Sequence, residues 1–256
     1  MIYDIPSPTL SKDYIEALKV AAEHLEFMAA RVGMELLWIR ADPHGPSLEH
    51  LSFFCGGQAY FVRLVDAAEK AVFPGSKEGL LRIAKAYRGF ACWMALRRLS
   101  VPGMAPWAPV LPDWDLWDIG SGGSIRPEEQ ALAEPLPVTS WELHDFAVQV
   151  VRETLRRHRL EITAWNSDPE VQPAIWFKGA SGLEWASVGE CLGTPFQVPV
   201  PESLQEHASS LTAKGFRGWW GPVGFAPLVR KPGRLDGLYR GEGANVDFRG
   251  LMPLPF

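Results

Sequence analysis

The predicted secondary structure elements come in the same order in both halves of this chain, and no other sequence feature constrains its fold as strongly. In the first half, apolar residues recur every three or four positions over 12–32, which is typical of one face of a helix. The later segments are predicted as strands over 35–40, 48–55 and 58–65, a helix over 76–87 and a strand over 90–96. The first half therefore reads helix, strand, strand, strand, helix, strand.

The second half repeats this order. Thr139 and Glu142 have the spacing of a capping box, and an amphipathic stripe follows them, so a helix is predicted to begin there. Ser203 and Glu206 have the same spacing and predict the start of a second helix that ends at Gly215. The strands are predicted over 160–165, 174–178, 183–188 and 216–226.

Short local patterns also align between the halves. Asp42-Pro43 aligns with Asp168-Pro169 at an offset of 126 residues. The other aligned pairs are Phe54 and Gly56 with Phe177 and Gly179, Gln58 and Val62 with Glu184 and Val188, and Arg88-Gly89 with Arg217-Gly218. Each change of offset falls in a predicted loop. We interpret the chain as an internally duplicated α/β (α+β) fold with two similar halves, the alternative being two unrelated α/β segments with similar turns.

A proline-rich stretch separates the halves. Residues 101–139 contain seven prolines, a Gly-Ser run at 120–124 and three tryptophans. Proline excludes a regular helix or a central strand, and the tryptophans indicate that the stretch packs against the protein surface. The predicted organisation is a first α/β half over 1–100, a connector over 101–139 and a second α/β half over 140–256.

The composition excludes several classes of protein. The 256 residues include 25 Lys and Arg against 30 Asp and Glu, a net charge of −5, and 47% are hydrophobic. Such a chain is neither disordered nor a simple nucleic-acid coat, and it has no apolar run long enough to span a membrane. The first ten residues lack the basic start of a secretory signal. Cys55, Cys92 and Cys191 lack paired spacing, so we expect free thiols, no structural zinc and a cytoplasmic protein.

The element order of the second half resembles the core of the PD-(D/E)xK nuclease-like superfamily. Asp168 stands before the second strand, and Glu184 follows 16 residues later in the third. In that family, acids at these places bind Mg²⁺ or Mn²⁺, and a lysine two residues after the second acid orients the attacking water. The resemblance implies that Asp168 and Glu184 are metal ligands, with Glu142 or Asp145 as an accessory acid.

This chain departs from the family pattern. Ala186 stands where the lysine belongs, and an amine would have to come from Lys178 on the neighbouring strand. The first half keeps Asp42, but residues 58–60 (Gln-Ala-Tyr) provide neither a carboxylate nor a lysine. The segments 141–152, 168–169, 173–177, 238–243 and 248–251 also resemble a group of uncharacterised bacterial proteins, which implies no activity.

Each candidate site residue also has a purely structural interpretation. An aspartate before proline is typical of a turn, and Glu184 could be a solvent-facing strand residue. His144 with Asp145 fits a general base and its orienting acid, or two residues that stabilise a helix start. The predicted helix closes on a basic cluster that fits either the helix dipole or contact with a phosphate or a partner, namely Arg152, Arg156, Arg157 and Arg159.

The missing lysine and the acidic net charge favour a non-catalytic scaffold or protein-interaction protein, built on a duplicated nuclease-like fold and needing no cofactor. We expect its partner to be another protein; nucleic acid is less favoured and a membrane is not expected. The alternative is a metal-dependent nuclease that uses Mg²⁺ or Mn²⁺ at a degenerate site of Asp168, Glu184 and Lys178. A third hypothesis is a small-molecule sensor with its pocket between the halves.

Overall fold

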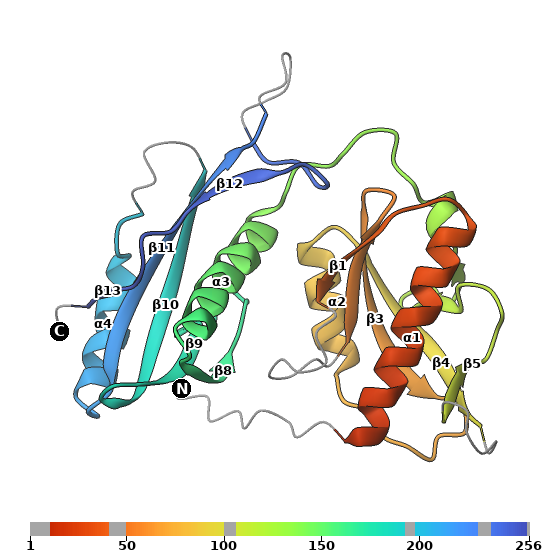
Figure 1. Cartoon of the computed structure of the whole chain (residues 1–256), viewed down its shortest axis with the longest axis horizontal. Coiled ribbons are helices and arrows are strands. Elements are labelled where there is room, and N and C mark those ends of the chain that lie inside the picture. The colour runs from red at the N-terminus through yellow and green to blue at the C-terminus, as the bar shows by residue number, and fades with distance from the viewer. Residues whose placement is uncertain (1–10, 41–49, 100–105, 193–197, 230–236, 255–256) are drawn as a thin grey trace. The chain divides into compact units, whose positions relative to one another are not determined.

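A computed structural model describes residues 11–40, 50–99, 106–192, 198–229 and 237–254 (Figure 1). The chain divides between Leu136 and Pro137 into two compact units. We call the described residues up to 136 the first unit and those from 137 onward the second unit. No helix in these described ranges is long and apolar enough to cross a membrane.

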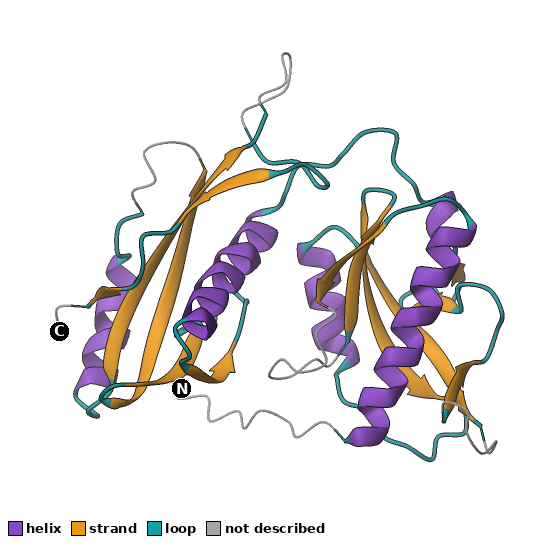
Figure 2. Cartoon of the chain, viewed as in Figure 1, coloured by secondary structure: helices purple, strands orange, loops and turns teal. Residues whose placement is uncertain are grey.

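The first unit combines two long helices with one mixed sheet (Figure 2). Its main elements are α1 (Lys12–Arg31), β1 (Leu36–Arg40), β2 (Leu51–Cys55), β3 (Gln58–Asp66), α2 (Lys77–Ala86) and β4 (Phe90–Arg98). The later ones are β5 (Trp107–Pro109), β6 (Leu116–Asp118), β7 (Ser124–Ile125) and the 3-10 turn η1 (Pro127–Glu129). Strands β1, β2 and β3 are antiparallel, whereas β3 and β4 are parallel and α2 connects them.

The two helices of the first unit lie on opposite faces of its sheet. Side chains alternate along a strand, so Tyr60, Val62 and Leu64 of β3 face the apolar stripe of α1 and form the main core with it. The intervening Phe61 points to the other face, where its ring meets Tyr87 at the end of α2 with centroids 4.9 Å apart. The sheet is therefore covered on both sides.

The second unit has the same arrangement. Its elements are α3 (Ser140–Arg157), β8 (Glu161–Trp165), β9 (Ile175–Gly179), β10 (Gly182–Leu192), α4 (Glu202–Thr212), β11 (Arg217–Pro227), β12 (Ala244–Asp247) and β13 (Met252–Pro253). Strands β8, β9 and β10 are antiparallel, and β10 and β11 are parallel through α4. One core lies between α3 and the sheet, and a second lies between α4 and the opposite face. The predicted duplicated α/β fold is confirmed.

The hairpin register corrects the residue alignment of the two halves. Gln58 opens β3 directly after the first hairpin turn, as Gly182 opens β10 after the second. Gln58 therefore corresponds to Gly182, whereas the sequence alignment pairs it with Glu184. The residue that corresponds to Glu184 is Tyr60. A slip of two residues keeps every side chain on its own face, so the hydrophobic pattern alone does not reveal it.

The same register changes the other aligned pairs. The corrected pairs are Phe53 with Phe177, Leu64 with Val188 and Phe90 with Arg217. The predicted pairing of Asp42-Pro43 with Asp168-Pro169 lies outside the described residues of the first unit.

The predicted connector is part of the first repeat. Strands β5 and β6 pair with β4, just as β12 and β13 pair with the corresponding strand β11. Trp107 and Trp114 are buried in the core beneath α1, and the indole nitrogen of Trp107 donates to Asp13 at the start of that helix. The duplication therefore covers the described part of 101–136 as well, and this stretch belongs to the first unit.

Three of the four predicted helix starts agree with the structure, because α1, α2 and α3 begin within one residue of the predicted positions. The Ser11 hydroxyl accepts a hydrogen bond from the backbone of Tyr14, and Thr139 forms the complete capping box with Glu142. The predicted capping box at Ser203 is wrong, because α4 begins two residues earlier, after Pro201, without a side-chain cap. Pro201 takes the N-cap position with an extended backbone, at φ −61° and ψ 141°, so the Ser-x-x-Glu spacing pointed to the wrong residue.

Candidate functional site

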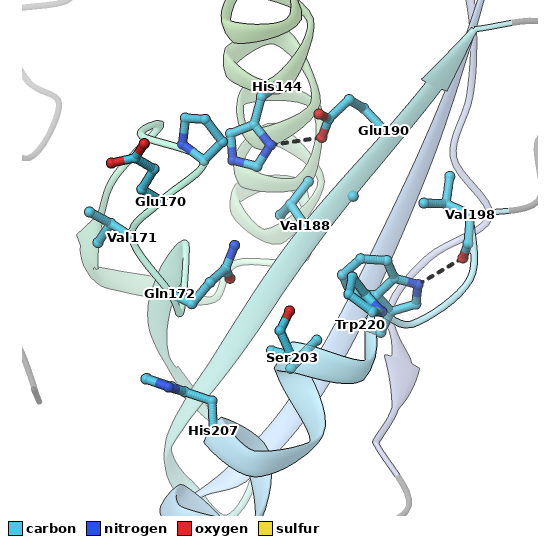
Figure 3. Close-up of a pocket in the computed structure, with 14 residues that line it drawn as sticks. His144, Glu170, Val171, Gln172, Val188, Glu190, Val198, Ser203, His207 and Trp220 are labelled. Atoms are coloured by element: carbon cyan, nitrogen blue, oxygen red, sulfur yellow. Dashed lines mark hydrogen bonds and ion pairs between the residues drawn. The ribbon is translucent and has the colours of Figure 1, made fainter. Parts of the chain in front are cut away.

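A cavity of about 630 Å³ lies in the second unit, lined by residues of α3, β10, the loop before β9 and the start of α4 (Figure 3). Its polar lining consists of His144, Glu170, Gln172, Glu190, Ser203 and His207. Its apolar lining includes Val171, Val188, Val198, Leu204 and Trp220. A cavity of this size with a few convergent polar groups is the usual form of a small-ligand site.

The lining combines a histidine of α3 with a glutamate of β10. Glu190 lies at an even-numbered position of β10, like Val188, and so faces α3. Its carboxylate lies 2.7 Å from Nδ1 of His144, a buried residue only 3% exposed. An ionised carboxylate only accepts hydrogen bonds, so Nδ1 carries the proton. In the neutral ring, Nε2 then presents a lone pair.

Two buried polar atoms in the cavity lining have no hydrogen-bond partner among the described residues. These are Nε2 of His144 and the side-chain oxygen Oε1 of Gln172. Figure 3 shows the second ring nitrogen of His144 turned away from Glu190. A buried polar atom left without a partner costs about 1–3 kcal/mol, so both atoms are suited to hydrogen bonding with a molecule in the cavity.

A glycine determines the shape of the apolar wall. A Cβ atom on Gly189 would lie 2.3 Å from the Trp220 ring. The missing side chain lets the indole pack against β10, where its nitrogen donates to the carbonyl of Val198 at 3.1 Å. The wall is therefore set by the contact between two neighbouring parallel strands and the segment that precedes α4.

Glu184, a predicted metal ligand, is engaged in structural contacts. Its carboxylate accepts hydrogen bonds from the Trp219 indole at 2.6 Å and from the Ser181 backbone at 3.0 Å. Gly179 makes room for it, since a Cβ there would lie 2.3 Å from the carboxyl carbon. Glu184 is buried, not solvent-facing. Its hydrogen bonds link the β9–β10 turn to β11.

Lys178, the predicted source of an amine, points to the opposite face of the sheet. Lys178 pairs with Leu183 across the hairpin, whereas Glu184 pairs with Phe177. Neighbouring positions on a strand face opposite ways, so the structure does not bring Lys178 and Glu184 together. The lysine instead contacts the exposed Glu161 of β8 at 2.8 Å.

Asp168 shapes the loop before β9. Its backbone donates to the side chain of Asn166 at 2.8 Å, and its carboxylate accepts from the backbone of Glu170 at 3.0 Å. These contacts are those of a turn. The loop carries Glu170 and Gln172 into the cavity lining, but neither Asp168 nor Glu184 is among the described residues that line it.

The accessory acids of α3 also have structural partners. Glu142, 0% exposed, completes the capping box and receives two hydrogen bonds from Arg240, at 2.7 and 3.0 Å. Asp145 accepts from Gln149 one turn later at 2.9 Å. Within the described ranges, no group of three or more His, Cys, Asp or Glu side chains is placed to hold a metal ion.

Three of the four predicted arginines line a groove of about 590 Å³ along α3. They are Arg152, Arg156 and Arg157; Arg159 is exposed just beyond the helix. Arg152 is buried, with its guanidinium 3.6 Å from the centre of the Trp165 ring. Val246, on β12, and Phe248, which follows it, form the apolar side of this arginine groove.

The cysteines of the first unit do not form a reactive site. Cys55, Cys92 and Cys191 are free, as predicted. Burial, with a smaller contribution from Glu128, raises the pKa of the Cys55 thiol to about 11. Burial also raises the pKa of the fully buried Cys92. Both thiols stay protonated at neutral pH and are poor nucleophiles.

Comparison with known proteins extends this description. Residues 141–254 match a domain of unknown function, DUF8840. The matched segment runs from the first turn of α3 to just beyond β13, so it contains the cavity, the arginine groove and the Glu142–Arg240 ion pair. The chain is thus similar to an uncharacterised family over its second unit. Neither the curated proteins nor the solved structures gave a match.

The sequence did not identify the residues that form the cavity with His144. Glu190 is 46 residues away in sequence, whereas the sequence pattern pairs His144 with its neighbour Asp145. A usable signal was the recurrence of polar Glu184 and Glu190 on the even-numbered face of an otherwise apolar strand. Gln172 and Glu170 lie in a loop, where no periodicity exists.

Proposed function

We propose that this chain is a non-catalytic interaction protein on a duplicated nuclease-like fold, and that its arginine groove contacts an acidic segment of a partner protein. The observation that carries the proposal is the convergence of Arg152, Arg156 and Arg157 beside Val246 and Phe248. Guanidinium groups bind carboxylates through paired, charge-assisted hydrogen bonds. The adjoining apolar surface suits a segment that also carries apolar side chains.

The occupant is a peptide segment rather than a nucleic acid because of the charge distribution. The chain carries a net charge of −5, which opposes the non-specific attraction on which nucleic-acid binding depends. Val246 is 48% exposed, and interfaces between proteins combine such apolar area with arginine.

The non-catalytic part of the proposal is supported by the contacts of the acids. The start of α3 is capped by Glu142, the β9–β10 hairpin is linked to β11 by Glu184, and the turn before β9 is stabilised by Asp168. Lys178 faces away from Glu184. A metal-dependent nuclease needs its acids and its amine around one ion. The structural partners of these acids therefore support a non-catalytic role.

Binding of an acidic peptide tests the interaction. The full-length protein is titrated into a fluorescein-labelled peptide of alternating glutamate and leucine, and binding is followed by fluorescence anisotropy. Arg156→Gln is expected to weaken binding about tenfold, because one charge-assisted hydrogen bond contributes about 1.5 kcal/mol. Lys214→Gln is the matched control, since Lys214 is exposed beyond α4. Equal losses in the two variants, or no binding, would contradict the proposal.

A nuclease assay tests the alternative. The protein is incubated with plasmid DNA and with single-stranded RNA in the presence of Mg²⁺ or Mn²⁺. We expect both nucleic acids to stay intact. Cleavage that Asp168→Ala abolishes would overturn the non-catalytic proposal and establish the nuclease instead.

A further inference from the structure

We infer that the cavity around His144 and Glu190 binds a primary alkylammonium group. This inference goes beyond the proposed interaction role and rests on different residues, since the arginine groove and the cavity share none of their lining. The experiments on the cavity and on the arginine groove can therefore fail separately.

The charge of the cavity favours a cation. The described lining residues include two glutamates, Glu170 and Glu190, and no lysine or arginine. Glu190 is 22% exposed and holds His144 through one carboxylate oxygen, Oε2. Its other oxygen keeps its capacity to accept. The carboxylates in a confined, partly apolar space attract a positive group more strongly than they would in open solvent.

The hydrogen-bond directions favour a donor with several protons. In the neutral ring, Nε2 of His144 presents a lone pair when Nδ1 donates to Glu190, and Oε1 of Gln172 is a second acceptor without a partner among the described residues. The carboxylate of Glu190 is the third acceptor in the lining. An ammonium group has three donors and no acceptor, so it matches these acceptors in number and kind. An anion or a carbonyl group would leave both acceptors unpaired.

The apolar wall favours an aliphatic stem. Val171, Val188, Leu204 and Trp220 line the same cavity as the acceptors. Burying each methylene of a stem against such a surface contributes about 0.8 kcal/mol. A divalent cation would gain nothing from this wall. Within the described residues, it would also lack a cluster of three ligating side chains.

Titration with n-butylamine tests the inference on the full-length protein. Binding is measured by calorimetry at neutral pH, where the amine is protonated, and n-butanol serves as the uncharged analogue. We expect butylammonium to bind at one site and butanol to bind at least about tenfold more weakly, because the charged hydrogen bonds are lost. Equal affinity of the two probes would overturn the inference.

A matched pair of variants locates the binding. Glu190→Gln keeps the side-chain shape and is expected to weaken butylammonium binding about tenfold. Glu161→Gln removes the same charge from an exposed position of the same unit and should leave the affinity unchanged. Unchanged affinity in Glu190→Gln, or the same loss in both variants, would contradict the assignment.

A measurement on the unaltered chain removes dependence on the variants. With isotope-labelled histidine, the nitrogen resonance of His144 Nε2 should move on addition of butylamine and stay in place with butanol. If the His144 Nε2 resonance did not move on addition of butylamine, the inference would be overturned, even if the Glu190 variant failed to fold.

The source of the ammonium group is distinguished by a third probe, a lysine residue with blocked amino and carboxyl groups. Binding as tight as that of butylamine supports a lysine side chain of a partner protein as the natural occupant. Exclusion of the blocked lysine, with butylamine still bound, supports a free small amine.

Discussion

The two units carry different residues at equivalent buried positions of one fold. At the third helix position after the N-cap, α1 has Tyr14 where α3 has Glu142. In the central strand, β3 has Tyr60 where β10 has Glu184. All four side chains are at most 2% exposed. The difference shows that the topology needs a filled position there, not an apolar one.

The partners of these side chains differ accordingly. Tyr60 stacks between the rings of Phe53 and Phe90, with centroids 5.1 and 5.3 Å apart. Glu184 instead accepts hydrogen bonds from Trp219 and Ser181. Aromatic contacts tolerate a lost partner better than a buried charge does, because an unpaired buried charge is very costly. The second unit is therefore held by contacts that depend on specific partners.

A third equivalent pair separates a structural role from a ligand-binding one. Asp66 ends β3 and Glu190 lies near the end of β10, at corresponding places of the sheet. Asp66 accepts hydrogen bonds from the backbones of Ala68, Lys70 and Ala71 and so closes the next loop. Glu190 extends toward α3 and the cavity. The longer side chain of Glu190 thus faces the cavity, whereas the shorter side chain of Asp66 caps a turn.

The largest expected effect comes from exchanging the first unit's residue for the second unit's. Tyr60→Glu should destabilise the first unit by about 5 kcal/mol, because it buries a carboxylate between two phenylalanine rings. The raised pKa of Tyr60, caused chiefly by burial, indicates how poorly this place accommodates charge. Urea unfolding of the full chain measures the loss, and Tyr60→Phe is the control, expected to stay within about 1 kcal/mol. A tolerated glutamate would remove the distinction between the units.

The next effect tests the buried ion pair of the second unit. Glu142→Ala leaves Arg240 buried without its carboxylate and also removes half of the capping box. We expect a loss of about 4 kcal/mol. Hydrogen exchange read by mass spectrometry should show faster exchange throughout the second unit and unchanged exchange in the first. Tyr14→Phe, at the equivalent place, should leave exchange in the second unit unchanged.

A smaller effect is expected from neutralising the strand glutamate. Glu184→Gln keeps the shape beside Gly179 but replaces charged hydrogen bonds to Trp219 and Ser181 with neutral ones. The expected destabilisation is about 2 kcal/mol, measured as a lower urea midpoint for the second unit. A loss below about 0.5 kcal/mol would mean that shape, not charge, is what this position requires.

The smallest effect compares Asp66→Asn with Glu190→Gln through pH. The backbone hydrogen bond from Ala68, followed by those from Ala71 and Lys70, lowers the pKa of Asp66 below its ordinary value. A lowered pKa stabilises the fold above the titration range of the unfolded chain's aspartate, and this stability is lost as the pH falls through the folded pKa. Asp66→Asn should cost about 1 kcal/mol at neutral pH and nothing at strongly acidic pH.

The companion variant gives the contrast. Glu190→Gln should change stability by less than about 0.5 kcal/mol at neutral pH, because the amide oxygen can still accept from His144. Thermal melts across the acidic range measure both variants. If Glu190→Gln lost as much stability as Asp66→Asn, the contrast between a loop cap and a ligand site would disappear.

The candidate site was less predictable than the fold. The residues predicted from the nuclease-like resemblance were chosen by their spacing along the chain. That spacing placed Glu184 in the correct strand, but it could not show that Trp219 would occupy its carboxylate. The arginines of α3 were easier to find, since helical periodicity places residues three or four apart on one side. Val246 and Phe248 of the same groove come from a distant strand and have no local signal.

The sequence by itself determined the order of the elements, the duplication and most element boundaries, because these depend on local periodicity, caps and turns. Only the tertiary structure decided the register between the repeats, the inclusion of residues 106–136 in the first unit, and the meeting of His144 with Glu190. Register slips of two residues leave the hydrophobic pattern unchanged. Contacts between distant segments depend on how strands and helices pack together, which no short stretch of sequence specifies.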